Sequence, residues 1–331
     1  MTGCSLFRRA LALLVFLVVP SVSVMAQSFP VTVHHALGET TIASQPKRIV
    51  SLGLNDQDFL YALGIAPVGV REWWGRKPFA TWPWAEPLRQ KLGAAPEVMT
   101  GRRIDPEWVL SLAPDLIVAT YADLDETTYR KLSRIAPVIA SPEGYLPWGA
   151  PWQVQLRQLD MATSGSTDKA DTIIAGIQRR ITGIRADHPE FSGSSGSFAD
   201  FRDGQFVLWG NGTSPGRFLA DLGFVLPDRL STLADDAGWI RLSLEQAPLL
   251  DLDTVIWPNG QRERIEAMKS YRNLRLSREN RSIWLEPDSD LSAALWFQSP
   301  LSLDFVLERI TPLLATVLQC APRRPSCAIT R

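Results

Sequence analysis

Side chains that could do acid–base, nucleophilic or metal chemistry are few in this sequence, and they are not grouped. The three histidines are His34, His35 and His188. His34 and His35 fall in an alternating segment that predicts an edge hairpin, where we expect a polar surface rather than a metal site. His188 follows a long predicted helix and is expected to cap it. Neither the spacing of a catalytic triad nor that of a metal site is present.

Other catalytic patterns are equally weak. The segment Trp209-Gly210-Asn211-Gly212 lacks the spacing and the lysine of a phosphate-binding loop. Carboxylates are scattered, and the sequence places no pair of them on one element for acid–base work. We expect neither a Gly-x-Ser-x-Gly nucleophile elbow nor a catalytic histidine. The sequence therefore favours binding over catalysis.

The first 26 residues predict a secretory signal peptide. Arg8 and Arg9 form a basic start, an apolar run extends from Leu11 to Val19, and Val24-Met25-Ala26 is a cleavage site with small residues. Cys4 precedes the apolar run, so we do not expect it to carry a lipid anchor. We expect cleavage after Ala26 and a mature protein in the periplasm.

Composition narrows the class of protein further. Loss of the signal leaves 32 basic against 35 acidic residues, which changes the net charge from −1 to −3 and argues against a nucleic-acid binder. Export makes a disulfide between Cys320 and Cys327 plausible, and it would pin the C-terminal tail. The 12 tryptophans are enough to line a cleft for a flat or bulky ligand.

One long helix is expected to organise the chain. Apolar residues from Ala170 to Ile184 recur at helical spacing within the segment Thr167 to Asp187, and Pro189 ends it. At ~1.5 Å per residue this helix spans ~30 Å. No other segment matches it in length and regularity. We interpret it as a rigid strut between two lobes.

Strands and helices alternate on both sides of the strut, which indicates parallel βαβ units and an α/β fold of two lobes joined by a single long helix. We expect a signal peptide at 1–26, an N-terminal lobe at 27–165, the connecting helix at 166–189, a C-terminal lobe at 190–319 and a tail at 320–331. Residues 71–100 are expected to be irregular, 243–247 to be helical, and 302–317 to form a closing helix kinked or broken at Pro312.

Several short motifs, in order along the mature chain, resemble the iron–siderophore binding proteins of ABC importers, and most closely their ferric-hydroxamate branch. The motifs are Pro46–Leu52, Asp58–Gly64, Leu112–Val118, Leu132–Val138, Gly216–Gly223, Ser243–Gln246, Leu250–Asp253 and Ser299–Leu303. The resemblance implies two α/β lobes, one rigid connecting helix and a ligand bound between the lobes. It also implies that the protein is not an enzyme.

The resemblance further implies which residues contact the ligand. Arg103, within Gly101-Arg102-Arg103-Ile104-Asp105-Pro106, corresponds to an arginine that contacts iron-bound oxygens, and a guanidinium suits that task. Tyr121 corresponds to a site tyrosine, and Trp239 lies near a second-lobe tryptophan of the family. Further candidates by position alone are Trp73, Trp74, Trp209, Trp257 and Trp296.

An acid on each lobe of these proteins docks onto arginines of the membrane permease. Asp58 stands where the resemblance implies the first-lobe acid, although the usual residue is Glu. In the second lobe Arg217 stands where an acid is expected, and Asp221 is a substitute. The implied partner is the permease of an ABC importer in the inner membrane.

The leading hypothesis is a monomeric periplasmic receptor that captures a ferric siderophore, with the hydroxamate type favoured, and delivers it to an ABC importer. The ligand is the iron complex, and no cofactor or directly bound metal is expected. The same fold could instead bind haem or a corrinoid. From another class, a secreted α/β hydrolase is the remaining alternative.

Overall fold

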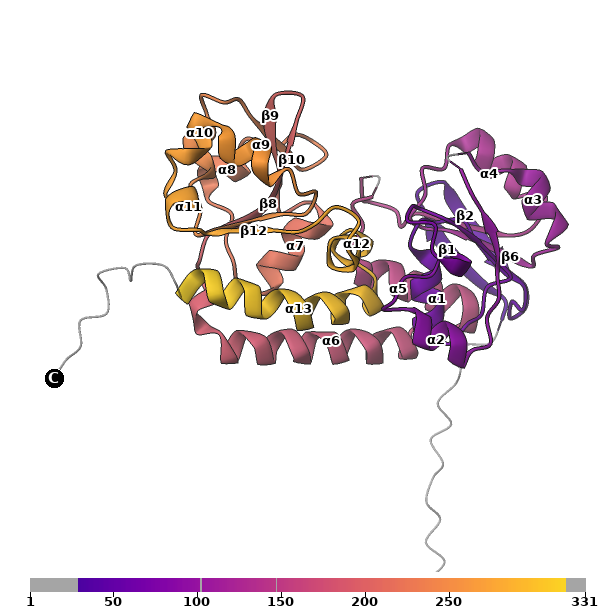
Figure 1. Ribbon diagram of the computed structural model, residues 1–331. Helices are drawn as coiled ribbons and strands as arrows, with labels where there is room; N and C mark the ends of the chain where they lie inside the picture. Colours follow the sequence, from indigo (N-terminus) through magenta and orange to yellow (C-terminus); the bar gives the residue numbers. More distant parts are fainter. Residues whose placement is uncertain (1–28, 102, 147, 320–331) are drawn as a thin grey trace, which may run out of the picture.

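The computed structural model describes residues 29–101, 103–146 and 148–319. Two α/β lobes stand side by side on a pair of long helices (Figure 1). The predicted fold class, two α/β lobes joined by a long helix, is confirmed. The predicted signal peptide and the tail with Cys320 and Cys327 lie outside the described residues.

The first lobe contains a five-stranded sheet in the order β5-β4-β3-β6-β7, with every neighbouring pair parallel. The strands are β3 (Ile49–Ser51), β4 (Gly69–Arg71), β5 (Glu97–Met99), β6 (Leu116–Ala119) and β7 (Val138–Ala140). All residues of β3, β6 and β7 are buried, because helices cover both faces of a parallel sheet.

Five helices and a short hairpin complete the first lobe. The helices are α1 (Asp56–Ala62), α2 (Glu86–Lys91), α3 (Pro106–Ser111), α4 (Glu126–Leu132) and α5 (Trp152–Ser164), with a short 3₁₀ turn, η1, at Pro78–Ala80. Asp105 caps α3, since its carboxylate accepts the N–H of Glu107. The hairpin pairs β1 (Val31–His35) with β2 (Gly38–Ile42) in an antiparallel sheet of its own.

The expectation that His34 and His35 both belong to a polar surface is wrong for His35. It lies on the inward face of β1 with Val31 and Val33, and it is buried rather than part of a polar surface. Its Nε2 atom is 2.9 Å from Thr40 Oγ1, and the ring packs edge-on against Tyr129. The two-residue period of the strand places His34 outside and His35 inside.

The second lobe has a mixed sheet in the order β10-β9-β8-β11-β12. Its strands are β8 (Gly196–Arg202), β9 (Gln205–Trp209), β10 (Trp239–Leu242), β11 (Thr254–Trp257) and β12 (Ser282–Trp284). β8 and β9 form an antiparallel hairpin around Asp203 and Gly204, which both have positive φ. β8, β11 and β12 run parallel.

Helices surround this second sheet. They are α7 (Ser214–Asp221), α8 (Asp228–Ser231), α9 (Arg262–Ala267), α10 (Lys269–Arg272), α11 (Arg275–Arg278) and α12 (Asp290–Phe297), with 3₁₀ turns η2 (Pro189–Phe191) and η3 (Ala247–Leu250). In Figure 1, α7 lies between the sheet and the long helices, while α12 lies between the two lobes. The interval between the lobes is therefore spanned by α12 as well as by the long helices.

The connection between the lobes is a helix pair. Helix α6 (Asp168–Asp187) is the predicted strut, and α13 (Pro300–Gln319) packs along it (Figure 1). The expectation that no other segment matches α6 in length is wrong, because each helix has 20 residues. Helix α13 continues through Pro312 without the predicted break. Two packed helices resist bending more than a single one.

Two further expectations about local structure are wrong. Residues 71–100 are not wholly irregular, since they contain η1, α2 and β5. The segment from Ser243 to Gln246 is a turn rather than a helix, and the first helical residues of this region begin at Ala247. Local side-chain bonds hold the turn: Gln246 Oε1 accepts the Ser243 N–H, and the Ser243 hydroxyl donates to Glu245.

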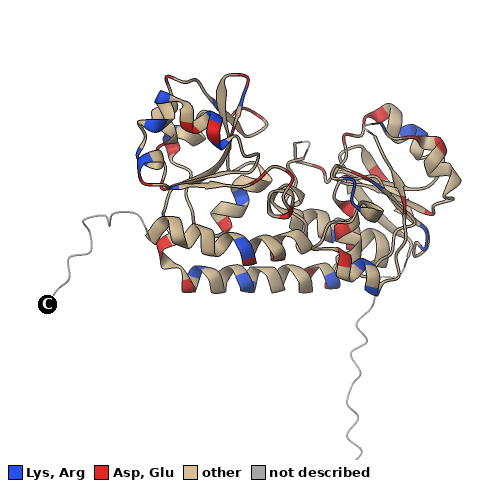
Figure 2. Cartoon of the chain, viewed as in Figure 1, with Lys and Arg blue, Asp and Glu red and all other residues tan. Residues whose placement is uncertain are grey.

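One hydrophobic cluster extends from the first lobe through the helix pair into the second lobe, and it includes Leu60, Ile174, Phe218 and Leu307. Each lobe has a second cluster on the other face of its sheet. Acidic and basic side chains are interspersed over both lobes (Figure 2). No helix in the described part of the chain is long and apolar enough to cross a bilayer.

Candidate functional site

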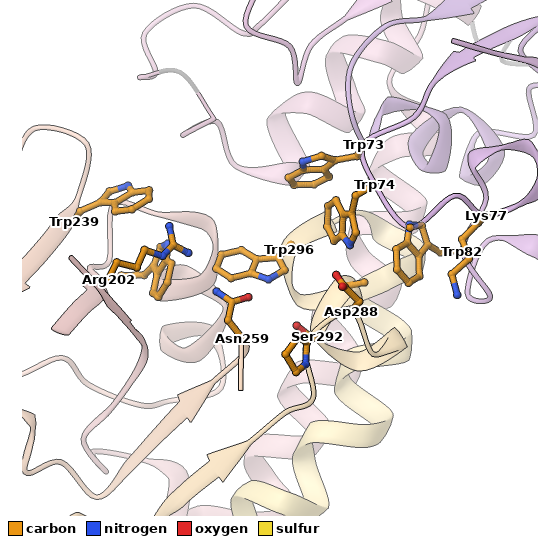
Figure 3. A pocket seen from close by; sticks show the side chains of 14 residues that line it. Trp73, Trp74, Lys77, Trp82, Arg202, Trp239, Asn259, Asp288, Ser292 and Trp296 are labelled. Atoms are coloured by element: carbon orange, nitrogen blue, oxygen red, sulfur yellow. The ribbon is translucent and has the colours of Figure 1, made fainter. Parts of the chain in front are cut away.

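Two adjoining cavities lie between the lobes and share Trp73, Trp209, Trp239 and Trp296 in their walls. We call the first, of about 730 Å³, the polar chamber (Figure 3). Its other lining residues are Trp74, Gly75, Lys77, Trp82, Arg202, Asn259, Pro287, Asp288, Ser292 and Ala293. We call the second, of about 910 Å³, the apolar chamber. Its other lining residues include Leu54, Tyr121, Leu146, Trp148, Gly149, Pro215, Ala234, Asp235, Asp236, Ala237 and Arg241.

Strand pairing brings the second-lobe tryptophans together. Trp209 ends β9 and Trp239 begins β10, and the two are direct partners in that antiparallel pair. Their rings are 5.7 Å apart, and the Trp209 ring is 5.1 Å from that of Trp296 on α12. Edge-on and tilted contacts at such distances are favourable for aromatic rings. The shared wall is therefore a packed group of indoles from three elements.

Phe297 joins the first-lobe tryptophans to this group. It is buried at the end of α12, and its ring lies between 5.1 and 6.1 Å from the rings of Trp73, Trp74, Trp82 and Trp84. Its backbone carbonyl accepts a 2.6 Å hydrogen bond from Asn55 Nδ2, in the loop before α1. These contacts hold the end of α12 against the first lobe, and Trp296 of the same helix lines both cavities.

Tyr121 is positioned by a buried carboxylate. It follows β6, and Asp56 Oδ1 accepts its backbone N–H at 3.1 Å. Both carboxylate oxygens also accept bonds from Thr120, and Gln155 Nε2 donates to Oδ1 at 2.9 Å. Burial raises the pKa of Asp56, and these hydrogen bonds oppose the shift. Burial also raises the pKa of Tyr121, so its phenol keeps its proton at neutral pH.

Each cation that lines the two chambers is paired with a carboxylate. Lys77 Nζ is 3.5 Å from Asp290 Oδ1, Arg202 Nε is 2.6 Å from Asp200 Oδ2, and Arg241 pairs with Asp235. The same cations lie over indole rings: Lys77 over Trp82, Arg202 over Trp209 and Trp239, and Arg241 over Trp239. The chambers therefore present donors without a large excess of positive charge.

A third cavity of about 600 Å³ lies on the first-lobe side and shares Trp73 and Trp148 with the apolar chamber. Arg71, the last residue of β4, lines it together with Glu72 and Asp123. Arg71 is buried, which lowers its pKa, and the charge of Asp123 opposes that shift. The first lobe thus presents a guanidinium to the cleft from a strand end.

The structure brings six of the eight predicted ligand residues to the two chambers, and two lie elsewhere. The six are Trp73, Trp74, Tyr121, Trp209, Trp239 and Trp296. Arg103 is exposed in the loop before α3 and lines none of the three cavities described above. Trp257 is buried in the second-lobe core, stacked 5.1 Å from Trp284, because it points to the opposite face of the sheet from Trp209.

The predicted docking acids differ in exposure. Asp58 is wholly buried, where it accepts hydrogen bonds from Trp84 Nε1 at 2.6 Å and Ser299 Oγ at 2.7 Å. A carboxylate held inside the protein cannot reach an arginine of another protein, so the prediction for Asp58 is wrong. Asp221 is exposed at the end of α7, near Arg217. Its docking role stays a prediction.

A nucleophile elbow was not expected, yet Gly212-Thr213-Ser214-Pro215-Gly216 does match Gly-x-Ser-x-Gly and follows a strand. Thr213 caps α7 here, and Ser214 receives a bond from Arg217. The histidines lie elsewhere, with their rings on Glu39, on Thr40 and on Glu190. Ser214 thus has no histidine beside it among the residues described. Within residues 29–319, apart from positions 102 and 147, no cluster of His, Cys, Asp or Glu could hold a metal ion.

Residues that the sequence analysis missed include Lys77, Trp148, Asp200, Arg202 and Asn259. One signal could have found a pair of them. Asp200 and Arg202 are two residues apart at the end of β8, so their side chains share a face. The turn that follows them places this face beside the cavity. Asn259 has no such local signal, because it meets Asp200 only through the pairing of β8 with β11.

The chain is similar to several characterised proteins. A periplasmic solute-binding protein of Mycobacterium smegmatis, known from its crystal structure, is 35% identical, with a TM-score of 0.76 over 87% of this chain and 98% of that one. A probable siderophore-binding lipoprotein of Bacillus subtilis, YfiY, is 28% identical over 232 residues, 68% of each protein. The achromobactin-binding periplasmic protein of Dickeya dadantii is 29% identical over 225 residues, 66% of this chain and 69% of that protein.

A family model described as periplasmic binding protein matches residues 49–276. These residues include every strand of the two five-stranded sheets except β12. The match therefore takes in the strands that carry Tyr121, Trp209 and Trp239. The chain belongs to the periplasmic binding protein family, whose members bind solutes for transport and are not enzymes.

Proposed function

We propose that this protein captures a ferric siderophore between its lobes and delivers it to the permease of an ABC importer in the inner membrane. Membership of the periplasmic binding protein family supports the transport role, and the names of the two curated relatives support the ligand class. The observation that carries the proposal is the pair of chambers walled by four shared tryptophans. Cavities of this size are typical of sites for drug-sized ligands.

Hydroxamate complexes fit the charge of the chambers best. Three hydroxamates, each with one negative charge, cancel the charge of a ferric ion, whereas three catecholates leave an excess of negative charge. Lys77, Arg202 and Arg241 are each paired with a carboxylate, so the chambers have little positive charge left to offset such an excess. The indole walls suit the organic part of the ligand.

Haem or a corrinoid is less well supported. None of the three histidines lines a chamber, and the rings of all three contact other groups. Tyr121 is the tyrosine of the chambers, and its phenol carries its proton at neutral pH. An axial ligand for haem iron is therefore lacking among the residues described for the two chambers.

Location, assembly state and docking are part of the proposal. The signal peptide is cleaved after Ala26, and the mature chain works in the periplasm as a monomer. The name of the B. subtilis relative describes a lipoprotein and that of the D. dadantii relative a periplasmic protein, which supports export of this chain. Asp221 is the exposed acid proposed for docking on the second lobe, and Cys320 and Cys327 form the proposed disulfide. Intact mass of the exported chain checks cleavage and oxidation together.

Titration of the mature protein with ferric siderophores tests the ligand. Ferric trihydroxamates and ferric tricatecholates are added separately while tryptophan fluorescence is followed, with the iron-free ligands as controls. We expect strong quenching with a trihydroxamate, because several indoles line the chambers. Unchanged fluorescence and no heat of binding across the whole panel would contradict the proposal. Mass spectrometry of ligand that copurifies from iron-limited cells would then identify the compound.

A further inference from the structure

We infer that Arg202, held in place by Asp200, donates hydrogen bonds to the iron-bound oxygens, and that this ion pair makes the site select complexes without net charge. The inference rests on the proposed function and names a second-lobe contact that the sequence analysis did not predict. Arg202 ends β8 and lines the polar chamber. In Figure 3 it lies next to Asn259 and Trp239, on the side of the chamber opposite Trp74 and Trp82.

Arg202 is fixed at both its backbone and its side chain. Its backbone pairs with Gln205 across the tight turn at Asp203 and Gly204. Its Nε atom donates a 2.6 Å hydrogen bond to Asp200 Oδ2. The guanidinium carbon lies 5.7 Å from the Trp209 ring and 5.8 Å from the Trp239 ring. A side chain held in this way loses little conformational entropy when a ligand binds.

Asp200 is built as a support. It is buried, with 3% of its surface exposed. Oδ1 accepts the N–H of Phe201 at 2.8 Å, and Oδ2 accepts Asn259 Nδ2 at 2.7 Å in addition to Arg202. β8 and β11 run parallel, so their ends bring Asp200 and Asn259 together. Because both carboxylate oxygens accept hydrogen bonds, Asp200 is held in one orientation, and its bond to Nε fixes the position of Arg202.

The terminal nitrogens of Arg202 remain available to a ligand. Among the residues that the structure describes, the hydrogen bond of this side chain is made through Nε. Nη1 and Nη2 form the planar fork that matches a pair of oxygens, and 41% of the side chain is exposed. The fork therefore provides two donors above an indole wall, within the chamber that also holds Lys77 and Asn259.

Other cations of the chambers are less well suited to this role. Lys77 is a single ammonium group, and 44% of the side chain of its partner Asp290 is exposed. Arg241 pairs with Asp235, whose side chain is 40% exposed on a loop. Water competes for both of these pairs. Only Arg202, of these three cations, has a buried acid behind it.

The Arg202–Asp200 ion pair explains why the site prefers complexes without net charge. A guanidinium paired with a buried carboxylate keeps its N–H donors while the net charge of the pair is zero. Oxygens of a neutral trihydroxamate need donors but no extra positive charge. A tricatecholate brings excess negative charge into the polar chamber, where Asp200 repels it. Removing the charge of Asp200 should therefore change the preference between the two classes of complex.

Four variants of the mature chain test this: Arg202→Gln, Arg202→Lys, Asp200→Asn and, as a matched control, Arg264→Gln. Arg264 is an exposed arginine of the same lobe that lies over the Phe201 ring and lines neither chamber. Dissociation constants for one ferric trihydroxamate and one ferric tricatecholate are measured by fluorescence and calorimetry. Circular dichroism and the unfolding midpoint check that each variant is folded.

We expect Arg202→Gln and Arg202→Lys each to weaken trihydroxamate binding by about tenfold, because both lose the two-donor fork. Asp200→Asn should improve the affinity for the tricatecholate relative to the trihydroxamate by about tenfold, because it frees a positive charge. Arg264→Gln should match the wild type. Unchanged trihydroxamate affinity in both Arg202 variants would overturn the inference, and so would an equal loss for both ligands in a folded Asp200→Asn protein. Absence of binding by the wild type would instead refute the proposed function.

Discussion

Ser299 Oγ donates a 2.7 Å hydrogen bond to Asp58 Oδ2, which ties the first turn of α1 to the residue that precedes α13. Trp84 Nε1 donates to the same oxygen at 2.6 Å. The other oxygen, Oδ1, has no hydrogen-bond partner among the residues described. A buried carboxylate therefore connects the first lobe to the helix that runs beneath the second lobe. It also determines how this contact responds to pH.

Asp58→Asn should change the pH dependence of stability. Burial raises the pKa of Asp58 to about 6, against an ordinary value of 3.8, and the bonds from Ser299 and Trp84 oppose the shift. The folded state therefore binds the proton more tightly than the unfolded state. The resulting stability is present below pH ~4 and is lost as pH rises through ~6, by roughly 3 kcal/mol. The free energy of unfolding of the wild type, relative to the variant, should fall across this window.

Urea denaturation from pH 4 to pH 7 measures this difference. Asp168→Asn is the control, because Asp168 is an exposed acid in the first turn of α6. It should not reproduce the change that Asp58→Asn makes between pH 4 and pH 7. A wild-type advantage over Asp58→Asn that stays constant or grows with pH would show that burial does not control this carboxyl group.

Asp56→Ala should destabilise the first lobe and disturb Tyr121. The carboxylate of Asp56 accepts four hydrogen bonds, from Thr120 N and Oγ1, Tyr121 N and Gln155 Nε2. Its removal leaves buried donors unpaired, and we expect the free energy of unfolding to fall by about 2–4 kcal/mol. Affinity for a ferric trihydroxamate should fall too, because the turn that carries Tyr121 loses its anchor. A folded variant with unchanged affinity would remove Asp56 from the positioning of Tyr121.

Trp257→Ala should cost stability and leave ligand affinity unchanged. Trp257 is 1% exposed, stacks on Trp284, and donates a 3.0 Å hydrogen bond from Nε1 to Ser282 Oγ. Truncation of a buried indole typically lowers the free energy of unfolding by about 3–5 kcal/mol. Urea denaturation measures the loss, and a binding titration at low temperature checks the cleft. Weaker binding by the folded variant would return Trp257 to the ligand site.

Trp296→Ala should show the reverse behaviour. Trp296 is half-buried on α12, lines both chambers and contacts Trp209 at 5.1 Å. Its side chain faces the cavities, so we expect a smaller loss of stability than for Trp257→Ala. Stacking and burial against a ligand are worth about 1–3 kcal/mol, so trihydroxamate affinity should fall by about fivefold or more. Equal affinities of variant and wild type would show that the ligand does not contact this wall.

Local sequence was sufficient for the regular elements. The Ile stripe predicted α6, and the alternation of strands and helices on both sides of it predicted the two α/β lobes. The turn residues Asp203 and Gly204 suit the β8–β9 hairpin. These features depend on helical period, on burial and on turn geometry, all of which are encoded within a few residues. The prediction of a helix at Ser243–Gln246 was wrong for a related reason, because the side chains of this segment bond to their own turn instead of starting a helix.

The family resemblance led to Tyr121 and Trp239, whereas sequence position alone led to Trp209. It could not separate Trp209 from Trp257, because both end strands in the same way. Trp209 belongs to the cluster on the cleft side of the second sheet, and Trp257 belongs to the cluster on the other side. Which side faces the other lobe depends on how the helix pair holds the two lobes, and no local pattern contains that information.

The amino-acid order alone therefore specifies two α/β lobes, a long helix between them and a set of tryptophans at strand ends. The fold adds three long-range contacts that give these parts their roles. Asp58 meets Ser299 far along the chain, Asp200 meets Asn259 through paired strands, and α13 packs along α6. Each contact brings together groups that are distant in sequence, and the packing around them then fixes their orientation. Composition and periodicity cannot supply that pairing, because it arises only when strands and helices from distant parts of the chain pack together.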